Sequence, residues 1–328
     1  MKYRLLGNTN LQVSEIGVGG SRFGSMIEQR NQKEIVKMLQ EALDKGINFY
    51  DTADSYGQGE SEKLIGSTFK NKREQVIIAT KAGYCLSPTG SFAAKIKPLL
   101  RPLIRWAKPL KKTLLQARSS QLNQNFSAEY LTQAVEASLK RLQTDYLDIF
   151  QLHDPPSTLL ESGEVVATLE ALKSQGKIRY CGAGCLSVED AVLCLKYPVF
   201  SAVQVEINLL NQSAITKLLP LAKEKQVGVI ARQAFASGAL VKLQQYPNSM
   251  VSEKSEDSQS QERAKKFEKY KQIIQGDRTL TQLALQFLLQ YDSVSTVIVG
   301  MSSQQHLEDN LKAIAAPPLT SEELAILN

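Results

Sequence analysis

Short apolar runs alternate along the chain with longer segments whose hydrophobic residues recur every three or four positions. The apolar runs have the length of strands that are buried on both faces. We predict eight strands, at 16–19, 48–51, 76–81, 146–152, 178–183, 202–206, 228–231 and 296–300. The amphipathic segments between them predict helices, for example at 32–45, 128–142 and 163–175, with Gly46 and Gly176 where helices commonly end.

Eight strand–helix units in 328 residues predict a (β/α)8 barrel rather than an open, doubly wound sheet. The length would also suit two domains, but one barrel accounts for the regular alternation, so we expect a single domain over 1–328. No GxGxxG motif follows the first strand, which agrees with the barrel.

Two segments interrupt the alternation. The first, 84–127, is too long for a loop between a strand and a helix. The second, 246–262, is polar and rich in Ser, Gln and Glu, and is typical of a mobile loop. Because both follow strands, we expect both to be long loops on the catalytic face of the barrel.

The composition is that of a globular protein, with 43% hydrophobic and 22% charged residues. It excludes a chain that is disordered throughout, a collagen, a coiled coil and a disulfide-stabilised mini-protein. No stretch reaches the ~18 uninterrupted apolar residues of a membrane span. The N-terminus, MKYRLLGNTN, lacks the apolar core of a signal peptide, so we expect a cytoplasmic protein.

Four cysteines without a CxxC pair and two histidines do not form the pattern of a zinc site, and we expect no metal. The net charge of +6 is only a weak indication of a nucleic-acid partner. What matters is where the charge lies along the chain.

Polar residues that end barrel strands are the first candidates for catalysis. Asp51 ends the second predicted strand, Lys81 the third and His153 the fourth, and Tyr56 follows Asp51 by five residues. A lysine paired with a carboxylate beside a tyrosine can stabilise the tyrosinate, and so lower a pKa that starts near ~10. Tyr56 could then donate or accept a proton near neutral pH, while His153, mainly neutral, polarises a carbonyl.

Each of these residues also has an ordinary structural interpretation. Asp51 could cap a helix, Lys81 could be a solvated strand end, Tyr56 could pack, and His153 could be a hydrogen-bonded residue at the rim. Their occurrence together, at the ends of three successive strands, favours the catalytic interpretation.

Several ordered motifs resemble the aldo-keto reductase family over nearly the whole chain. They are YRLLGNTNLQVSEIGVGG at 3–20, GINFYDTADSYGQGESEKLIG at 46–66, the strand ending in Lys81, YLDIFQLHDP at 146–155, GKIRYCGAG at 176–184, QVEINLL at 204–210 and VIVGMSSQQHLEDN at 297–310. The resemblance implies a (β/α)8 barrel with an N-terminal β-hairpin.

The resemblance also implies an oxidoreductase that transfers a hydride between NADP(H) and a small carbonyl or alcohol substrate. The family's four catalytic residues correspond to Asp51, Tyr56, Lys81 and His153, with Tyr56 as the general acid and base. Lys81 and Asp51 would tune Tyr56, and His153 would orient the carbonyl.

For the nicotinamide end of the cofactor, the family uses a Ser-Asn pair after the fifth strand and a Gln on the sixth. Gln204 matches the Gln, but Gly184 and Cys185 replace the pair, and a thiol is a poor hydrogen-bond partner. Arg232 occupies the place of an aromatic residue that stacks on the ring, and a guanidinium can also stack.

The remaining cofactor residues follow from the same resemblance. Ser237 and Gly238 would wrap the pyrophosphate, and Ser302 and His306 would lie near the 2′-phosphate, so that NADPH is preferred to NADH. The acid–amide pair Asp309 and Asn310 would hold adenine; an ordinary strand, loop and helix is the alternative for this segment. The other predicted cofactor contacts are Gly20, Asp51, Gln233, Ala234, Phe235 and Gly300.

The first insertion is basic: no Asp or Glu occurs from 75 to 128. If the segment is helical, one face carries Lys97, Arg101, Arg105, Lys108 and Lys112 and the opposite face is apolar, although three prolines interrupt it. A lid over the barrel mouth is favoured, followed by a site for anionic or amphipathic substrates and then by contact with a membrane surface. No nucleic-acid partner is expected, because Trp106 alone offers stacking there.

Two other functional classes stay open at this point. One is a regulatory or interaction subunit that binds NADP(H) on the same fold with vestigial catalysis. The complete set of four catalytic residues argues against it, and the replacement at Gly184–Cys185 argues for it. The other is a lyase or isomerase without nicotinamide, which would need a phosphate or metal site that the sequence does not offer.

Overall fold

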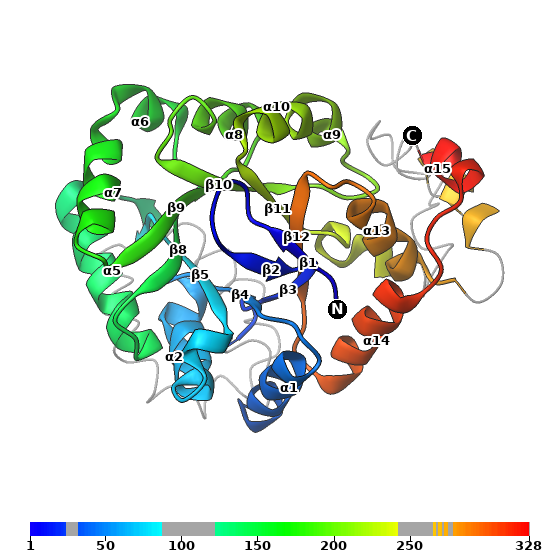
Figure 1. Ribbon diagram of the computed structural model, residues 1–328, viewed down its shortest axis with the longest axis horizontal. Helices are drawn as coiled ribbons and strands as arrows, with labels where there is room; N and C mark the ends of the chain where they lie inside the picture. The colour runs from blue at the N-terminus through cyan, green and yellow to red at the C-terminus, as the bar shows by residue number, and fades with distance from the viewer. Residues whose placement is uncertain are drawn as a thin grey trace, which may run out of the picture.

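The computed structural model describes residues 1–23, 32–86, 122–241 and 278–327, and 265–274 apart from 267 and 271. Eight parallel strands close into a barrel in the order β3-β4-β5-β8-β9-β10-β11-β12, with β12 paired to β3. Helices surround the strands on the outside (Figure 1). The predicted (β/α)8 barrel is therefore confirmed.

Every barrel strand begins and ends within two residues of its predicted bounds. The strands are β3 (Ile16–Gly19), β4 (Phe49–Asp51), β5 (Ile77–Ala82), β8 (Leu147–His153), β9 (Ile178–Gly184), β10 (Phe200–Glu206), β11 (Gly228–Arg232) and β12 (Val294–Gly300). The agreement arises because almost every position of these strands is buried, so each one stands out in the sequence as a mainly apolar run.

Amphipathic helices cover the outside of the barrel. They are α1 (Gln32–Asp44), α2 (Glu60–Phe69), α5 (Ala128–Leu142), α7 (Glu164–Ser174), α8 (Val188–Cys194), α10 (Leu219–Lys225), α13 (Leu280–Leu289) and α14 (Gln304–Ala315), with the shorter α6 (Ser157–Ser162), α9 (Ser213–Lys217) and α15 (Ser321–Leu327) and the 3-10 turns η1 (Tyr56–Gln58), η2 (Arg73–Gln75) and η3 (Ala236–Gly238). Gly46 and Gly176 adopt positive φ angles just after α1 and α7, as expected of helix ends.

The N-terminal β-hairpin, β1 (Tyr3–Leu5) and β2 (Gln12–Ser14), is antiparallel, as the resemblance implied. In Figure 1 it lies in the middle of the ring of strands. Its Leu6, Leu11 and Val13 are buried against side chains of the barrel interior, including Phe49 and Ile149. The hairpin therefore closes the end of the barrel where the strands begin and leaves the other end for chemistry.

The first long insertion begins and ends as a two-stranded ribbon. β6 (Tyr84–Leu86) pairs antiparallel with β7 (Leu122–Gln124), so a β-ribbon forms the base of the predicted lid. The basic face predicted between Lys97 and Lys112 lies outside the described residues, as does the polar loop 246–262.

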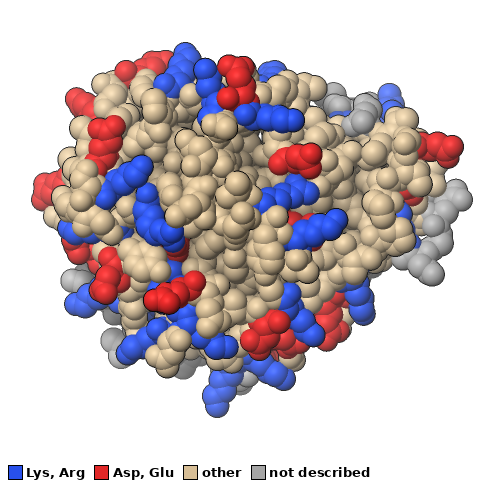
Figure 2. Space-filling model, in the orientation of Figure 1, with Lys and Arg blue, Asp and Glu red and all other residues tan. Residues whose placement is uncertain are grey.

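Basic and acidic side chains are interspersed on the face that Figure 2 shows, so the excess of positive charge is not gathered there. Within the part of the chain that the structure describes, no helix combines the length and apolarity needed to span a membrane.

An ionic cluster stabilises the end of the barrel that the hairpin closes. The buried carboxylate of Asp148 accepts hydrogen bonds from Arg73 at 2.7 Å, from Arg179 at 2.6 Å and from the backbone N–H of Ile78 at 3.0 Å. The Arg73 guanidinium also lies 4.1 Å from the centroid of the Tyr146 ring. These contacts join three adjacent strands, because Arg179 belongs to β9 while Asp148 and Ile78 belong to β8 and β5.

Replacing Asp148 with Ala should lower the free energy of unfolding by about 3 kcal/mol, because two arginines then lose their buried partner. Glu60→Gln is the control, since it removes an ion pair to Lys63 whose side chain is 57% exposed, and it should cost less than about 1 kcal/mol. Urea unfolding of both variants measures the difference. Equal losses would show that the cluster contributes no more than a surface pair.

Candidate active site

The four predicted catalytic residues meet at the end of the barrel opposite the hairpin. Asp51 is the last residue of β4, Lys81 the penultimate residue of β5 and His153 the last residue of β8, while Tyr56 begins η1. The carboxyl ends of all eight parallel strands point to this mouth of the barrel, so residues distant in sequence converge there.

A buried ion pair lies at the centre of the site. Lys81 Nζ donates to Asp51 Oδ1 at 2.6 Å, to Asp51 Oδ2 at 2.7 Å and to the backbone oxygen of Thr52 at 2.9 Å. The ammonium thus has a partner for each of its three protons, which offsets the cost of burying it.

Two amide side chains complete the surroundings of the carboxylate. Gln204 Nε2 donates to Asp51 Oδ1 at 2.8 Å, and Gln151 Nε2 lies 3.4 Å from the same oxygen. The family resemblance implied that Gln204 contacts the cofactor, but in the structure one N–H of its side-chain amide donates to Asp51. Gln151 was not predicted, although it lies two positions before His153, and alternate residues of a strand face the same side.

Tyr56 lies between the ion pair and the histidine. Lys81 Nζ is 5.1 Å from the centroid of its ring, and the His153 ring meets it edge-on at 5.8 Å between centroids. Burial raises the pKa of Tyr56 above its ordinary value, and the positive charge of Lys81 opposes this increase. The sequence predicted a lowered pKa, but in this structure burial outweighs Lys81.

His153 lies between two tyrosine rings. Besides Tyr56, the ring of Tyr84 meets it edge-on at 4.8 Å between centroids. Burial, together with the positive charges of Lys81 and Arg232, lowers the pKa of His153 well below its ordinary value. The imidazole is therefore neutral at pH 7, as the sequence predicted, and a neutral imidazole can donate one hydrogen bond without carrying charge.

A second ion pair lies beside the first. Arg232, the last residue of β11, donates to Asp154 Oδ1 at 3.3 Å and to the backbone oxygen of Cys185 at 2.8 Å. The other carboxylate oxygen of Asp154 accepts from the Tyr84 hydroxyl at 3.2 Å. Asp154 was not predicted as a site residue, although it directly follows His153 in the LHDPP motif.

The structure brings the predicted cofactor residues to the same mouth, but not all of their side chains face it. Gly20, Gly184, Arg232 and Gly300 lie at or next to strand ends, and Gln204 lies two residues before the end of β10. By contrast, the Cys185 thiol is fully buried, 3.9 Å from the Cys194 sulfur and 3.8 Å from the Ala183 oxygen. The position of this thiol gives no support to its predicted contact with a cofactor.

The predicted pyrophosphate segment has an unusual backbone. Four of its residues, Gln233, Ala236, Ser237 and Gly238, have positive φ angles between 48° and 90°. Only glycine adopts such angles without a cost in free energy. Non-glycine residues with positive φ angles are concentrated at functional sites of proteins. Ala234 and Phe235 lie between these positions and begin the same turn.

The segment after β12 agrees in part with the predicted contacts to the adenosine end of the cofactor. Ser302 is buried, and its Oγ lies 3.3 Å from Nδ1 of His306, which is exposed on the first turn of α14. Asp309 is exposed and accepts from Gln305, whereas Asn310 is buried on the inner face of α14. The structure does not bring the last two side chains to the same surface.

Buried polar atoms without hydrogen-bond partners concentrate at the mouth. Six such side-chain atoms occur in the described part of the chain, and four belong to residues of this region. These are Asp54 Oδ1, Gln151 Oε1, His153 Nδ1 and Arg232 Nε. Unpaired buried polar groups are costly, so their clustering indicates a site that a bound molecule completes.

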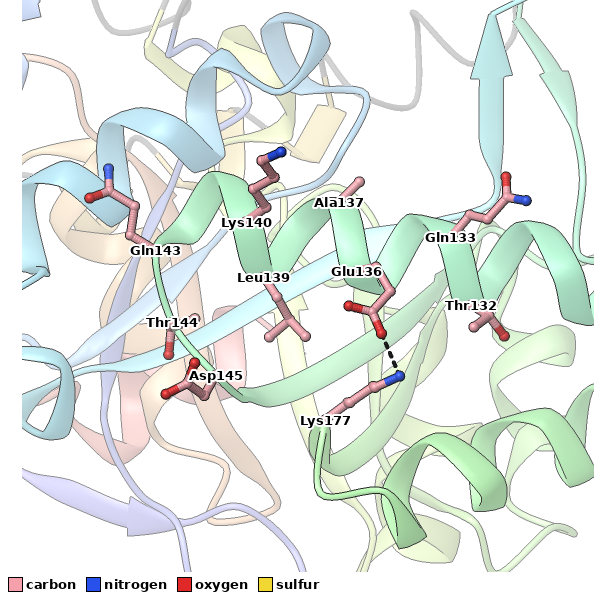
Figure 3. Close-up of a pocket in the computed structure, with 10 residues that line it drawn as sticks. All are labelled: Thr132, Gln133, Glu136, Ala137, Leu139, Lys140, Gln143, Thr144, Asp145 and Lys177. Atoms are coloured by element: carbon pink, nitrogen blue, oxygen red, sulfur yellow. Dashed lines mark ion pairs between the residues drawn. The ribbon is translucent and has the colours of Figure 1, made fainter.

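A groove of about 860 Å³ lies elsewhere, on the outer surface of the barrel (Figure 3). The Glu136–Lys177 ion pair crosses it. Lys177 directly precedes β9 and Asp145 lies just before β8, so the groove is at the end of the barrel opposite His153 and is not part of the site. Among the described residues, no three His, Cys, Asp or Glu side chains are grouped as a metal site would require.

Comparisons with known proteins agree with this geometry. The model of the aldo/keto reductase family matches residues 15–328. The chain is 31% identical over 330 residues to the uncharacterized oxidoreductase YqkF of Bacillus subtilis, covering 100% of this chain and 95% of that protein. It is also 31% identical to the L-galactose dehydrogenase of Arabidopsis thaliana, covering 96% of this chain and 88% of that protein.

The solved structures lead to the same family. The holo form of the aldo-keto reductase AKR11C1 from Bacillus halodurans superimposes with a TM-score of 0.74 at 27% identity, covering 100% of this chain and 95% of that chain. The chain therefore belongs to the aldo/keto reductase family, whose members are oxidoreductases that use nicotinamide cofactors.

Proposed function

We propose that the protein uses NADPH to reduce aldehydes or ketones, and NADP+ to oxidise the corresponding alcohols, with Tyr56 as general acid and base. The observation that carries this proposal is the buried Lys81 ammonium, fixed by Asp51 and placed 5.1 Å from the Tyr56 ring. We also propose that 1–328 form one domain, a proposal supported by the pairing of β12 with β3 that closes the barrel.

The chemistry follows from the groups around Tyr56. A bound nicotinamide cofactor supplies or accepts the hydride. As the substrate oxygen gains negative charge, it needs a proton and a stabilising hydrogen bond. Tyr56 supplies the proton, and the Lys81 charge stabilises the tyrosinate that remains. Neutral His153 donates its single N–H to the same oxygen and so orients the carbonyl.

The residues at the mouth suit a dinucleotide. The unpartnered Nε of Arg232 provides a buried hydrogen-bond donor, and the strained segment directly follows Arg232 at the same end of the barrel. Arg232 would lie against the nicotinamide, backbone amides near Ser237 and Gly238 would hold the pyrophosphate, and Ser302 with His306 would meet the 2′-phosphate. We also propose that the substrates are anionic or amphipathic, because the insertion contains many Lys and Arg and no Asp or Glu.

NADPH should bind more tightly than NADH, by about ten-fold, because Ser302 and His306 lie near the expected 2′-phosphate. The preference should be modest, since no Arg or Lys follows Gly300 by two positions, and Ser302 offers a neutral hydroxyl instead. Fluorescence titration of both cofactors measures it, with Ser302→Ala expected to reduce the ratio. Equal or tighter binding of NADH would contradict this proposal.

Tyr56→Phe should reduce the rate of hydride transfer by about 10² to 10⁴, the usual contribution of a general acid. Affinity for NADPH should hardly change, because the hydroxyl is assigned to the substrate oxygen. Stopped-flow measurement with one good aldehyde gives the rate without interference from product release.

Tyr180→Phe is the matched control for this experiment. Its hydroxyl bonds Asn10 at 3.0 Å at the opposite end of the barrel. The rate should therefore stay within about two-fold of wild type, since a substitution away from the site usually changes free energies by less than about 0.5 kcal/mol. If Tyr56→Phe also transfers hydride at the wild-type rate, the proton comes from another group and the proposed role of Tyr56 is wrong.

A further inference from the structure

We propose that Asp154 is the counter-ion and positioning residue for Arg232, and that it thereby determines how the nicotinamide end of the cofactor is held. This inference rests on the proposed function, in which Arg232 lies against the nicotinamide. It concerns a residue that the four-residue catalytic mechanism does not use.

The backbone of Asp154 is fixed from two sides. Its φ angle is +54°, in the left-handed region that non-glycine residues rarely adopt. Its N–H donates to the Gly184 oxygen at 2.8 Å, and its own oxygen accepts from Gln124 Nε2 at 2.7 Å. The strands β9 and β7 therefore hold the residue in a strained conformation, which is typical of functional positions.

The carboxylate of Asp154 joins two further elements. Oδ1 accepts from Arg232 of β11, and Oδ2 accepts from the Tyr84 hydroxyl of β6. The side chain is only 7% exposed, so both interactions are shielded from water. Arg232 is thus held in one place, with one nitrogen bonded and its Nε left without a partner among the described residues.

A counter-ion is needed here because two cations share a buried mouth. The positive charge of Arg232 acts on the pKa values of both Lys81 and Tyr56 as well as His153. Lys81 is neutralised by Asp51, and Asp154 is the partner found for Arg232. Without Asp154, an uncompensated positive charge would remain beside the reacting groups, where the surroundings screen it poorly.

Compared with the family pattern, fewer side chains here can contact the carboxamide of the nicotinamide, so Arg232 contributes more to holding this end of the cofactor. Gly184 has no side chain to offer, the Cys185 thiol is buried towards Cys194, and the Gln204 amide N–H donates to Asp51. Of the side-chain contacts that the resemblance implied for the carboxamide, those of Gly184 and Cys185 are therefore absent, and Gln204 keeps its amide oxygen and its second N–H for this contact. The planar guanidinium of Arg232 is left as the surface for the ring.

The nicotinamide ring carries a positive charge in NADP+ but not in NADPH, so the two forms should respond differently to the loss of Asp154. The reduced ring of NADPH is neutral and can stack on a guanidinium, whereas the oxidised ring of NADP+ is itself a cation. Asp154 offsets the repulsion between that ring and Arg232. Losing the Asp154 charge should therefore weaken the binding of NADP+ more than that of NADPH.

Calorimetric titration of wild type and Asp154→Asn with three ligands tests this inference. The ligands are NADPH, NADP+ and 2′-phospho-ADP-ribose, which lacks the nicotinamide ring. In Asp154→Asn we expect the dissociation constant of NADPH to rise about ten-fold, the contribution of a partly buried cation–π contact. That of NADP+ should rise about three-fold more, from charge repulsion, and that of 2′-phospho-ADP-ribose should not change.

Two further variants separate positioning from a general structural effect. Asp154→Glu keeps the charge and should recover part of the lost NADPH affinity. Tyr84→Phe removes the bond to Oδ2 but leaves the Arg232 pair, so its loss should be less than about three-fold, as for one neutral hydrogen bond.

Equal weakening of all three ligands in Asp154→Asn would show a purely structural role and overturn the inference, and so would no change in any of them. In either case wild type would still bind and oxidise NADPH with an aldehyde, and the proposed function would stand. A wild-type protein that binds none of the three ligands would overturn the proposed function and the inference with it.

Discussion

The cost of burying charge governs the structure of this barrel mouth. Lys81 and Asp51 lie on adjacent strands with almost no access to water, which is tolerable only when each polar atom has a partner. The backbone oxygen of Thr52 and the amide of Gln204 supply the remaining partners. Satisfying this pair fixes the ends of β4 and β5, and with them the start of the turn that carries Tyr56.

A second cation at the mouth is also paired with a carboxylate. Asp154 neutralises Arg232 as Asp51 neutralises Lys81, so two positive charges lie close to the reacting groups without a large net charge. Burial keeps His153 neutral and Tyr56 protonated in this structure. The polar atoms left without partners at the mouth mark where a cofactor and a substrate would complete the network.

The sequence predicted the barrel, and the four polar residues that meet at its mouth, because those features are local. Buried strands appear in the sequence as apolar runs, and a polar residue at the end of such a run can be recognised from the sequence alone. The partners of Gln204 and Arg232 could not be predicted, since they depend on side-chain orientation across strands that are distant in sequence. Likewise, the sequence placed Lys81 beside Tyr56 but could not weigh that charge against burial, so the direction of the pKa shift was wrong.

The pH dependence of alcohol oxidation tests the central claim, that the Asp51–Lys81 pair tunes Tyr56, most directly. The double variant Asp51→Asn, Lys81→Met removes both charges together, so that neither is left buried and unpaired. Lys81 favours the tyrosinate more strongly than Asp51 opposes it, so removing both should raise the pKa of Tyr56 further. The account predicts that the pH of half-maximal oxidation rises by about one unit or more in the double variant. An unchanged pH of half-maximal rate would contradict it.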